Sequence, residues 1–332
     1  MSLVLGAAGP VGKRVISALV SRGNNVVAAI RSTPLPDHLQ TTVAEQYLNV
    51  DVLDIDRLHK IFKRHPEIKT VWCMSLAPFS HAEAQVNGMR NVLQTMKEAN
   101  VGKMIFMDSV ASFGATAPRR DCSARWLSEN PGQDPGHEVG VVKREWRRMA
   151  RQFSAETNGD TRFAVVPGVL HTEASWGPGV TQYPLAALKA AMERAPFDCP
   201  VDPDRRLPMI FADDLVRGLM DLSDAPKNML SEPEGGYCLP GFSFSASELF
   251  AEIQRTIPEF APVVKLDERW DRLAHLWPET LSGHEAARDL GYRPQFGLGM
   301  TVHHILRAHK ARRRPAAVMA ELTSVSEQRG ES

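Results

Sequence analysis

The chain has 332 residues with 39 basic and 39 acidic side chains, so its formal charge is zero. A chain of this length can bury roughly three quarters of its unfolded surface, which argues against a disordered protein. Without a basic excess, nucleic acid and anionic membranes are not expected as partners. We therefore expect a small-molecule partner.

The four cysteines, Cys73, Cys122, Cys199 and Cys238, lie far apart and show no metal-ligand spacing. Such isolated cysteines favour a reducing compartment, and we expect a cytoplasmic protein. No apolar run reaches the ~18 residues of a membrane span, and no basic region followed by an apolar stretch opens the chain, so neither a span nor a signal peptide is expected. The scattered histidines predict no metal site.

Apolar runs of strand length alternate with amphipathic segments of helix length through the first 170 residues. The predicted strands are 2–5, 25–31, 45–50, 69–75, 103–108 and 162–168. The predicted helices between them are 12–22, 56–64, 83–98 and 139–155. This alternation predicts an α/β fold with a Rossmann-type, doubly wound parallel sheet.

The regular alternation of strand and helix segments ends after residue 168, where a loop rich in Gly, Pro and Trp is followed by predicted helices at 184–194 and 246–256. We expect a nucleotide-binding domain over 1–168 and a smaller C-terminal substrate-binding domain over 169–308, whose elements are free to interleave with the first. A polar tail is expected over 309–332.

A glycine-rich turn, GAAGPVG, follows the first strand and opens the first helix. Its glycines allow a tight turn, a close approach of the backbone to a pyrophosphate, and close packing of helix on strand, while the helix N-terminus attracts phosphates. The turn therefore predicts a dinucleotide site. Its expected contacts are Gly6, Gly9, Pro10, Val11 and Gly12.

Arg31 and Ser32 end the second strand, where an acidic residue would hold the ribose 2′-hydroxyl of NAD. A guanidinium instead grips a 2′-phosphate through charge-assisted hydrogen bonds, so NADP(H) is predicted, with help from Ser32 and from Lys13 or Arg14. The alternative is a solvated arginine. Asp51 and Val52 are predicted at the adenine edge, although Asp51 could equally cap the helix beginning near Asp54.

Several stretches in order resemble the extended short-chain dehydrogenase/reductase superfamily, and within it the branch of the L-threonine 3-dehydrogenases. They are DSVASFGATAPR (108–119), GPGVTQYP (177–184), FDCPVDPDRRLPMIFADDL (197–215) and FSFSASELFAEI (242–253). The resemblance implies further cofactor contacts at Ser75, Lys143, Pro167 and Val169, and substrate contacts at Ser109, Val139, Trp176, Thr181 and Tyr183.

The family's catalysis uses a serine and a YxxxK pair, in which the tyrosine exchanges the proton at the reacting oxygen. By this resemblance Ser109 is the serine, which orients the carbonyl, and Lys143 is the lysine, which holds the nicotinamide ribose. The tyrosine position is Val139, and a valine cannot exchange a proton.

Three proton sources stay open. His137 lies just before the vacated position, Tyr183 lies in the substrate segment, and a hydroxyl next to the carbonyl of a phenolic substrate could supply the proton itself. Atypical polyketide ketoreductases without the tyrosine exist in the superfamily.

The leading hypothesis is an NADPH-dependent ketoreductase acting on a bulky, aromatic, polyketide-like ketone, as in antibiotic biosynthesis. The alternatives are an inactive NADP(H)-binding sensor and a threonine-type dehydrogenase acting on a small alcohol. The superfamily often dimerises through the helices at 83–98 and 139–155, but arginines at 144, 147, 148 and 151 make the second helix cationic, so both a monomer and a homodimer stay open.

Overall fold

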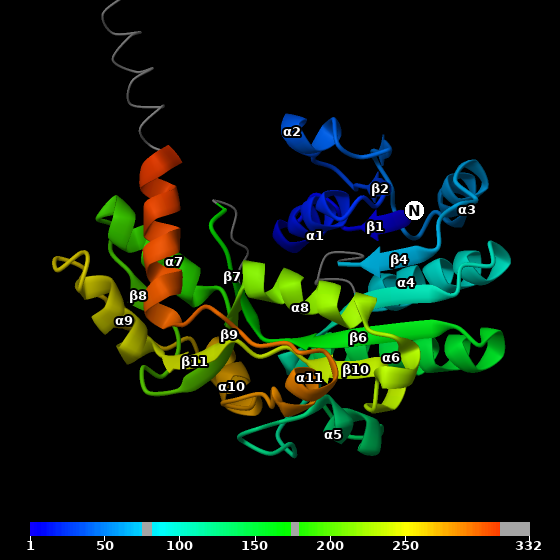
Figure 1. Ribbon diagram of the computed structural model, residues 1–332. Coiled ribbons are helices and arrows are strands. Elements are labelled where there is room, and N and C mark those ends of the chain that lie inside the picture. Colours follow the sequence, from blue (N-terminus) through cyan, green and yellow to red (C-terminus); the bar gives the residue numbers. More distant parts are fainter. Residues whose placement is uncertain (75–81, 174–178, 313–332) are drawn as a thin grey trace, which may run out of the picture.

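The computed structural model describes residues 1–74, 82–173 and 179–312. Its centre is a parallel sheet of seven strands (Figure 1). In spatial order these are β10 (Gly236–Cys238), β6 (Asp160–Val166), β5 (Lys103–Ser109), β4 (Thr70–Cys73), β1 (Ser2–Leu5), β2 (Val26–Ala29) and β3 (Glu45–Tyr47). The strand order reverses between β1 and β4, and ligands of such sheets bind at the carboxyl ends of the strands beside this point.

Helices cover both faces of the sheet, which is why its inner strands are buried throughout. One face packs against α3 (Ile55–Arg64), α4 (Ala82–Glu98) and α6 (Glu138–Thr157). The other packs against α1 (Pro10–Ser21) and α8 (Ala212–Asp224). Short helices α2 (Asp37–Gln40) and α5 (Ala124–Glu129) and the 3₁₀ turn η1 (Val110–Ser112) lie in the connections.

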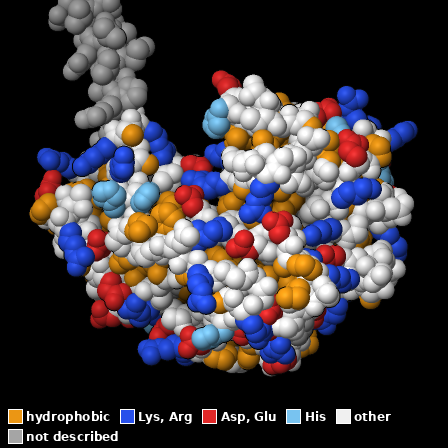
Figure 2. All heavy atoms as spheres, viewed as in Figure 1, with side chains coloured by type: hydrophobic (Ala, Val, Ile, Leu, Met, Phe, Trp, Pro, Cys, Tyr) orange, Lys and Arg blue, Asp and Glu red, His pale blue; other side chains and the backbone are white. Residues whose placement is uncertain are grey.

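The second half of the chain builds two small sheets and their helices. A mixed sheet has the order β11 (Phe242–Ser245), β9 (Arg206–Phe211) and β7 (Gly168–Leu170), and β12 (Val263–Val264) pairs with β8 (Asp198–Cys199). The helices are α7 (Tyr183–Glu193), α9 (Ala246–Gln254), α10 (Glu268–Leu276), α11 (His284–Asp289) and a helix over 298–312, with 3₁₀ turns η2 (Lys227–Met229) and η3 (Pro233–Gly235). Figure 2 shows this face of the molecule hollowed between the part that carries the C-terminal helix and the part that carries α1 and α2.

The predicted α/β fold is confirmed, and the regular elements of the first 170 residues lie within a few residues of their predicted bounds. The predicted strand at 162–168 is divided, since Pro167 has no N–H for a ladder and separates β6 from β7. Strand β10 returns from the second half to pair with β6, so the large sheet draws on both halves of the chain.

Within the described ranges, no helix is both long enough and apolar enough to cross a membrane.

Candidate dinucleotide and substrate site

The glycine-rich turn between β1 and α1 has the geometry of a phosphate cradle. Gly6 has a φ of +75°, which a side chain would strain. A Cβ atom at Gly12 would come within 2.2 Å of the Gly6 carbonyl oxygen, so this close packing requires glycine. Helix α1 starts at Pro10 with no side-chain cap and no acidic residue in its first turn, which leaves its N-terminus open to an anion. The turn thus fits a dinucleotide pyrophosphate.

Arg31 and Ser32 follow β2 and are both exposed. Arg31 forms no hydrogen bond or ion pair with any part of the chain that the structure describes. A cation with no partner at the carboxyl edge of the sheet is free to bind a phosphate.

Lys13 and Arg14, which were expected to assist Arg31, have partners inside the protein. Lys13 Nζ lies 2.7 Å from a Glu173 carboxylate oxygen, and Arg14 contacts Glu173, Thr172 and, at 3.2 Å, Asp213. These pairs fix the segment after β7 against α1. Local sequence patterns do not indicate a role for Glu173, since its partners Lys13 and Arg14 lie more than 150 residues away.

Asp51 and Val52 lie in the turn between β3 and α3. Asp51 Oδ1 accepts a hydrogen bond from the Leu53 N–H at 2.9 Å, and Asp54, not Asp51, caps α3 by accepting from the Arg57 N–H. Val52 is buried. Asp51 is exposed, as an adenine contact would require.

Ser109 is the last residue of β5, and its hydroxyl oxygen accepts a hydrogen bond from the Ala111 N–H at 3.2 Å. The start of α6 packs against this turn. A Cβ atom at Gly140 would lie 2.2 Å from the Ala111 carbonyl oxygen, so helix and turn are in direct contact there. Val139, half-buried and packed on the apolar core, therefore stands beside the end of β5.

Lys143 is buried on the same helix, with Nζ 2.8 Å from the Met107 carbonyl oxygen and 3.6 Å from the centre of the Trp146 ring. Burial lowers the pKa of Lys143 to about 8, while Asp108 opposes this shift. Strand β4 pairs with β5 only as far as Phe106, one residue before Met107. Because Lys143 contacts Met107, its ammonium lies where β5 extends past the end of β4.

His137 is the N-cap of α6, where its Nδ1 accepts a hydrogen bond from the Val139 N–H at 3.3 Å. Burial lowers the pKa of His137, Arg269 acts in the same direction, and Glu138 opposes them. The imidazole is therefore neutral near pH 7. Its accepting nitrogen, Nδ1, is already hydrogen-bonded to the Val139 N–H.

The remaining predicted contacts follow β6. Pro167 is buried, Val169 is half-buried, and Thr181 lies against β7, since a Cβ at Gly168 would meet the Thr181 Cβ at 2.9 Å. Tyr183 is buried, and burial raises its pKa above the usual value. Ser75 and Trp176 lie outside the described residues.

A family model of NAD dependent epimerases and dehydratases matches residues 2–232. The chain belongs to this family. The pig mitochondrial L-threonine 3-dehydrogenase is 26% identical over 95% of this chain and 84% of its own length. A GalE-like L-threonine dehydrogenase from Cupriavidus necator is similar in structure, with a TM-score of 0.81, 25% identity, and coverage of 92% of this chain and 98% of that one.

UDP-glucose 4-epimerase from Thermotoga maritima shares the fold, with a TM-score of 0.78 at 16% identity over 93% of this chain and 98% of that chain. The predicted superfamily is thus confirmed, and the chain is an oxidoreductase of the epimerase/dehydratase family, for which a nicotinamide dinucleotide is the expected cofactor.

Sequence reasoning did not place Asp108 and Arg147 at this family's site, and it counted Arg147 only among the arginines that make its helix cationic, whereas Arg147 is buried. The Asp108 carboxylate accepts from the Ser109 N–H at 2.6 Å and the Ser112 hydroxyl at 2.5 Å, and it pairs with Arg147 of α6. The signal was available, because Asp108 precedes Ser109 and Arg147 lies one helical turn after Lys143.

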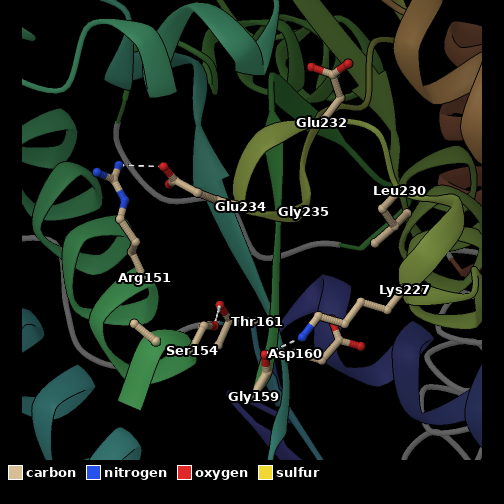
Figure 3. Close-up of a pocket in the computed structure, with 11 residues that line it drawn as sticks. Arg151, Ser154, Gly159, Asp160, Thr161, Lys227, Leu230, Glu232, Glu234 and Gly235 are labelled. Carbon is tan, nitrogen blue, oxygen red and sulfur yellow. Dashed lines mark hydrogen bonds and ion pairs between the residues drawn. The ribbon is translucent and has the colours of Figure 1, made fainter. Parts of the chain in front are cut away.

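A separate pocket of about 390 Å³ lies between the C-terminal part of α6, the start of β6 and the loop before β10 (Figure 3). It is at the amino ends of the strands, away from the nucleotide turn. Its charged groups all have partners within the protein. Arg151 pairs with Glu234 at 2.6 Å, and Lys227 donates to the Gly159 carbonyl at 3.0 Å, while Glu232 and Asp160 pair with arginines outside the pocket. Among the described residues, no His, Cys, Asp and Glu side chains gather in a group able to hold a metal ion.

Proposed function

We propose that the protein is an NADP(H)-dependent oxidoreductase that reduces the carbonyl group of a bulky aromatic ketone. The observation that carries the cofactor preference is Arg31, which is exposed at the end of β2 and has no partner among the described residues. A guanidinium there favours a 2′-phosphate over a free hydroxyl. Gly6, Gly9 and Gly12 would hold the pyrophosphate, and when bound the reduced dinucleotide supplies the hydride.

Ser109 and Lys143 have separate roles in this proposal. The Ser109 hydroxyl, at the carboxyl end of β5, donates to the substrate carbonyl oxygen and orients it. Lys143 holds the nicotinamide ribose from the crevice beside β4 and β5, and its ammonium favours negative charge developing on the nearby oxygen.

The proton for the new hydroxyl must come from a group other than the residue at position 139, which is valine. His137 has little imidazolium near pH 7 to act as an acid, because burial lowers its pKa and its Nδ1 accepts the Val139 N–H instead of holding a proton. Tyr183 is buried in the apolar core, where its raised pKa opposes proton release. We therefore assign the proton to the substrate.

A ketone with a neighbouring phenolic hydroxyl has this proton in place. The carbonyl carbon accepts the hydride, the π electron pair moves to the carbonyl oxygen, and that oxygen takes the proton of the neighbouring hydroxyl. Solvent returns a proton to the phenolate, so the product is the alcohol with its phenol intact. Aromatic polyketides contain this arrangement.

A groove of about 450 Å³ beside the start of α7 supports an aromatic substrate. Tyr183, Phe197 and Trp270 line it, together with polar side chains that include Lys189 and Asp198. Helix α10, which carries Trp270, ends close to the start of α6, because a Cβ at Gly136 would meet Leu276 at 3.2 Å. Aromatic walls with a few polar groups are usual for small-molecule sites.

A threonine-type dehydrogenase acting on a small amino alcohol is the second candidate, favoured by the similarity to L-threonine 3-dehydrogenases over most of both chains. Oxidation of such an alcohol needs a group that removes the hydroxyl proton, and Val139 cannot do so.

Titration with NADPH and NADH, followed by absorbance assays with phenolic ketones, simple ketones and L-threonine, separates the candidates. NADPH preference with turnover of phenolic ketones alone supports our proposal. NADH preference with threonine oxidation overturns it, and tight NADPH binding without any turnover supports a sensor.

A further inference from the structure

A buried ion pair links the end of β5 to the middle of α6. The Asp108 side chain is fully buried and the Arg147 side chain is 5% exposed. Arg147 Nη1 also donates to the Ser112 hydroxyl oxygen at 3.1 Å, and Ser112 donates to Asp108 at 2.5 Å. Two charges and a hydroxyl thus form a closed network behind the candidate site.

Buried ion pairs are a weak source of stability, because the desolvation of both charges offsets their attraction. Apolar side chains of similar volume would stabilise the same position as well or better. The location of this pair points to a different role. Asp108 is adjacent to Ser109 and binds its N–H at 2.6 Å, while Arg147 follows Lys143 by one helical turn.

The pair also acts on the charge of Lys143. Asp108 on β5 favours the ammonium form and Arg147 on α6 disfavours it. The other groups facing Lys143 are the Cys73 thiol of β4, the Met107 carbonyl of β5 and the Trp146 ring. Burial raises the pKa of Cys73 to about 12, so this thiol is neutral near pH 7 and Asp108 is the negative charge that favours the ammonium form of Lys143.

We propose that Asp108 and Arg147 are positioning residues that fix Ser109 relative to Lys143, and that within this pair Asp108 is the group that keeps Lys143 charged. The inference rests on the proposed function for its consequence in catalysis, whereas the effect on Lys143 itself does not depend on the substrate. In a chain without the family tyrosine, fewer groups organise the reacting oxygen, so the relation between Ser109 and Lys143 matters more.

The test compares Asp108→Asn and Arg147→Gln with the parent chain. The Lys143 titration is followed by NMR of ¹³C-labelled lysine, with the signal assigned by its loss in Lys143→Met. Loss of the carboxylate is expected to move the Lys143 midpoint about one unit to lower pH, and loss of the guanidinium to move it in the opposite direction. The control is Arg148→Gln, since Arg148 is exposed on the same helix and pairs with Glu145.

Opposite shifts in the two variants, with no shift in the control, support the inference. Unchanged midpoints accompanied only by a lower Tm overturn it, because a purely structural pair would affect stability alone. If a variant fails to fold, Ser112→Ala removes one hydrogen bond of the network while keeping both charges. It is expected to lower kcat at least threefold with little change in the NADPH dissociation constant, and an unchanged kcat contradicts the positioning role.

The proposed function and the inference about Asp108 and Arg147 can be disproved independently. If the parent chain does not bind NADPH, the proposed function fails, while the order of the three Lys143 midpoints still decides the inference about Asp108 and Arg147.

Discussion

Gly140 lies directly against Ala111: a Cβ atom at position 140 would come within 2.2 Å of the Ala111 carbonyl oxygen. This contact sets the first turn of α6 on the turn that follows β5. Ser109 and Val139 flank the two sides of the contact, so residues far apart in the sequence become neighbours in the candidate site.

Gly140→Ala should therefore separate α6 from the end of β5. The added methyl group would also lie 2.4 Å from the Pro135 Cβ, and overpacking of this kind costs about 1 to 3 kcal/mol. We expect a loss of that size in the urea unfolding free energy and a larger fall in turnover than in NADPH affinity. Gly132→Ala is the control, because a Cβ there meets nothing within 4 Å. Equal effects at the two positions would contradict the packing argument.

Arg31→Ala should weaken NADPH binding about tenfold to a hundredfold and leave NADH binding nearly unchanged. The physical reason is the loss of a charge-assisted contact that only the 2′-phosphate can make. Fluorescence titration of both cofactors measures this directly. Arg22→Ala is the matched control, since Arg22 is an exposed arginine at the opposite end of α1, paired with Asp224. An equal loss of affinity for both cofactors would show that Arg31 does not bind the 2′-phosphate.

His137→Ala should destabilise the fold by about 1 kcal/mol and keep most of the turnover. The loss reflects the missing N-cap of α6, where His137 Nδ1 accepts from the Val139 N–H. His137→Ser should restore stability, because serine is a good N-cap. Turnover abolished in both variants, with NADPH binding intact, would instead make His137 the proton donor.

Lys143 should make stability depend on pH in a defined direction. Burial lowers its pKa in the folded protein to about 8, against ~10.4 in the unfolded chain. Between these values the unfolded chain binds more protons, so the penalty for burying the charge is relieved as the pH rises from 8 to 10. Relative to Lys143→Met, the parent chain should gain about 1 to 3 kcal/mol across this window. Urea unfolding at several pH values measures the difference, with exposed Lys97→Met as the control. A pH-independent difference would mean that burial does not lower the pKa of Lys143 below its value in the unfolded chain.

Local patterns in the sequence were sufficient to predict the sheet, its covering helices and the glycine-rich turn. Each depends on residues close in the chain, such as the alternation of strands with helices around Gly6 and Gly12. The pairing of β10 with β6 was beyond such reasoning, because a three-residue strand leaves little pattern and its partner is distant in sequence.

The same limit applies to the candidate site. Arg31 could be found because its position follows from the end of β2, whereas the partners of Lys13 and Arg14 depend on how the segment after β7 folds back onto α1. The role of His137 as a cap depends on where α6 begins, and helix ends are the least certain feature of a sequence pattern.

In the proposed reaction the substrate, not the protein, supplies the proton. The most direct test measures NADPH oxidation by the parent chain with an aromatic ketone that bears a hydroxyl beside the carbonyl, and with the methyl ether of the same ketone. The two compounds differ little in size, but the ether has no proton to give. We expect turnover of the phenol and a rate at least ~100-fold lower for the ether, in line with the contribution of a positioned acid. Equal rates for the two ketones would contradict this expectation and would mean that a group of the protein supplies the proton.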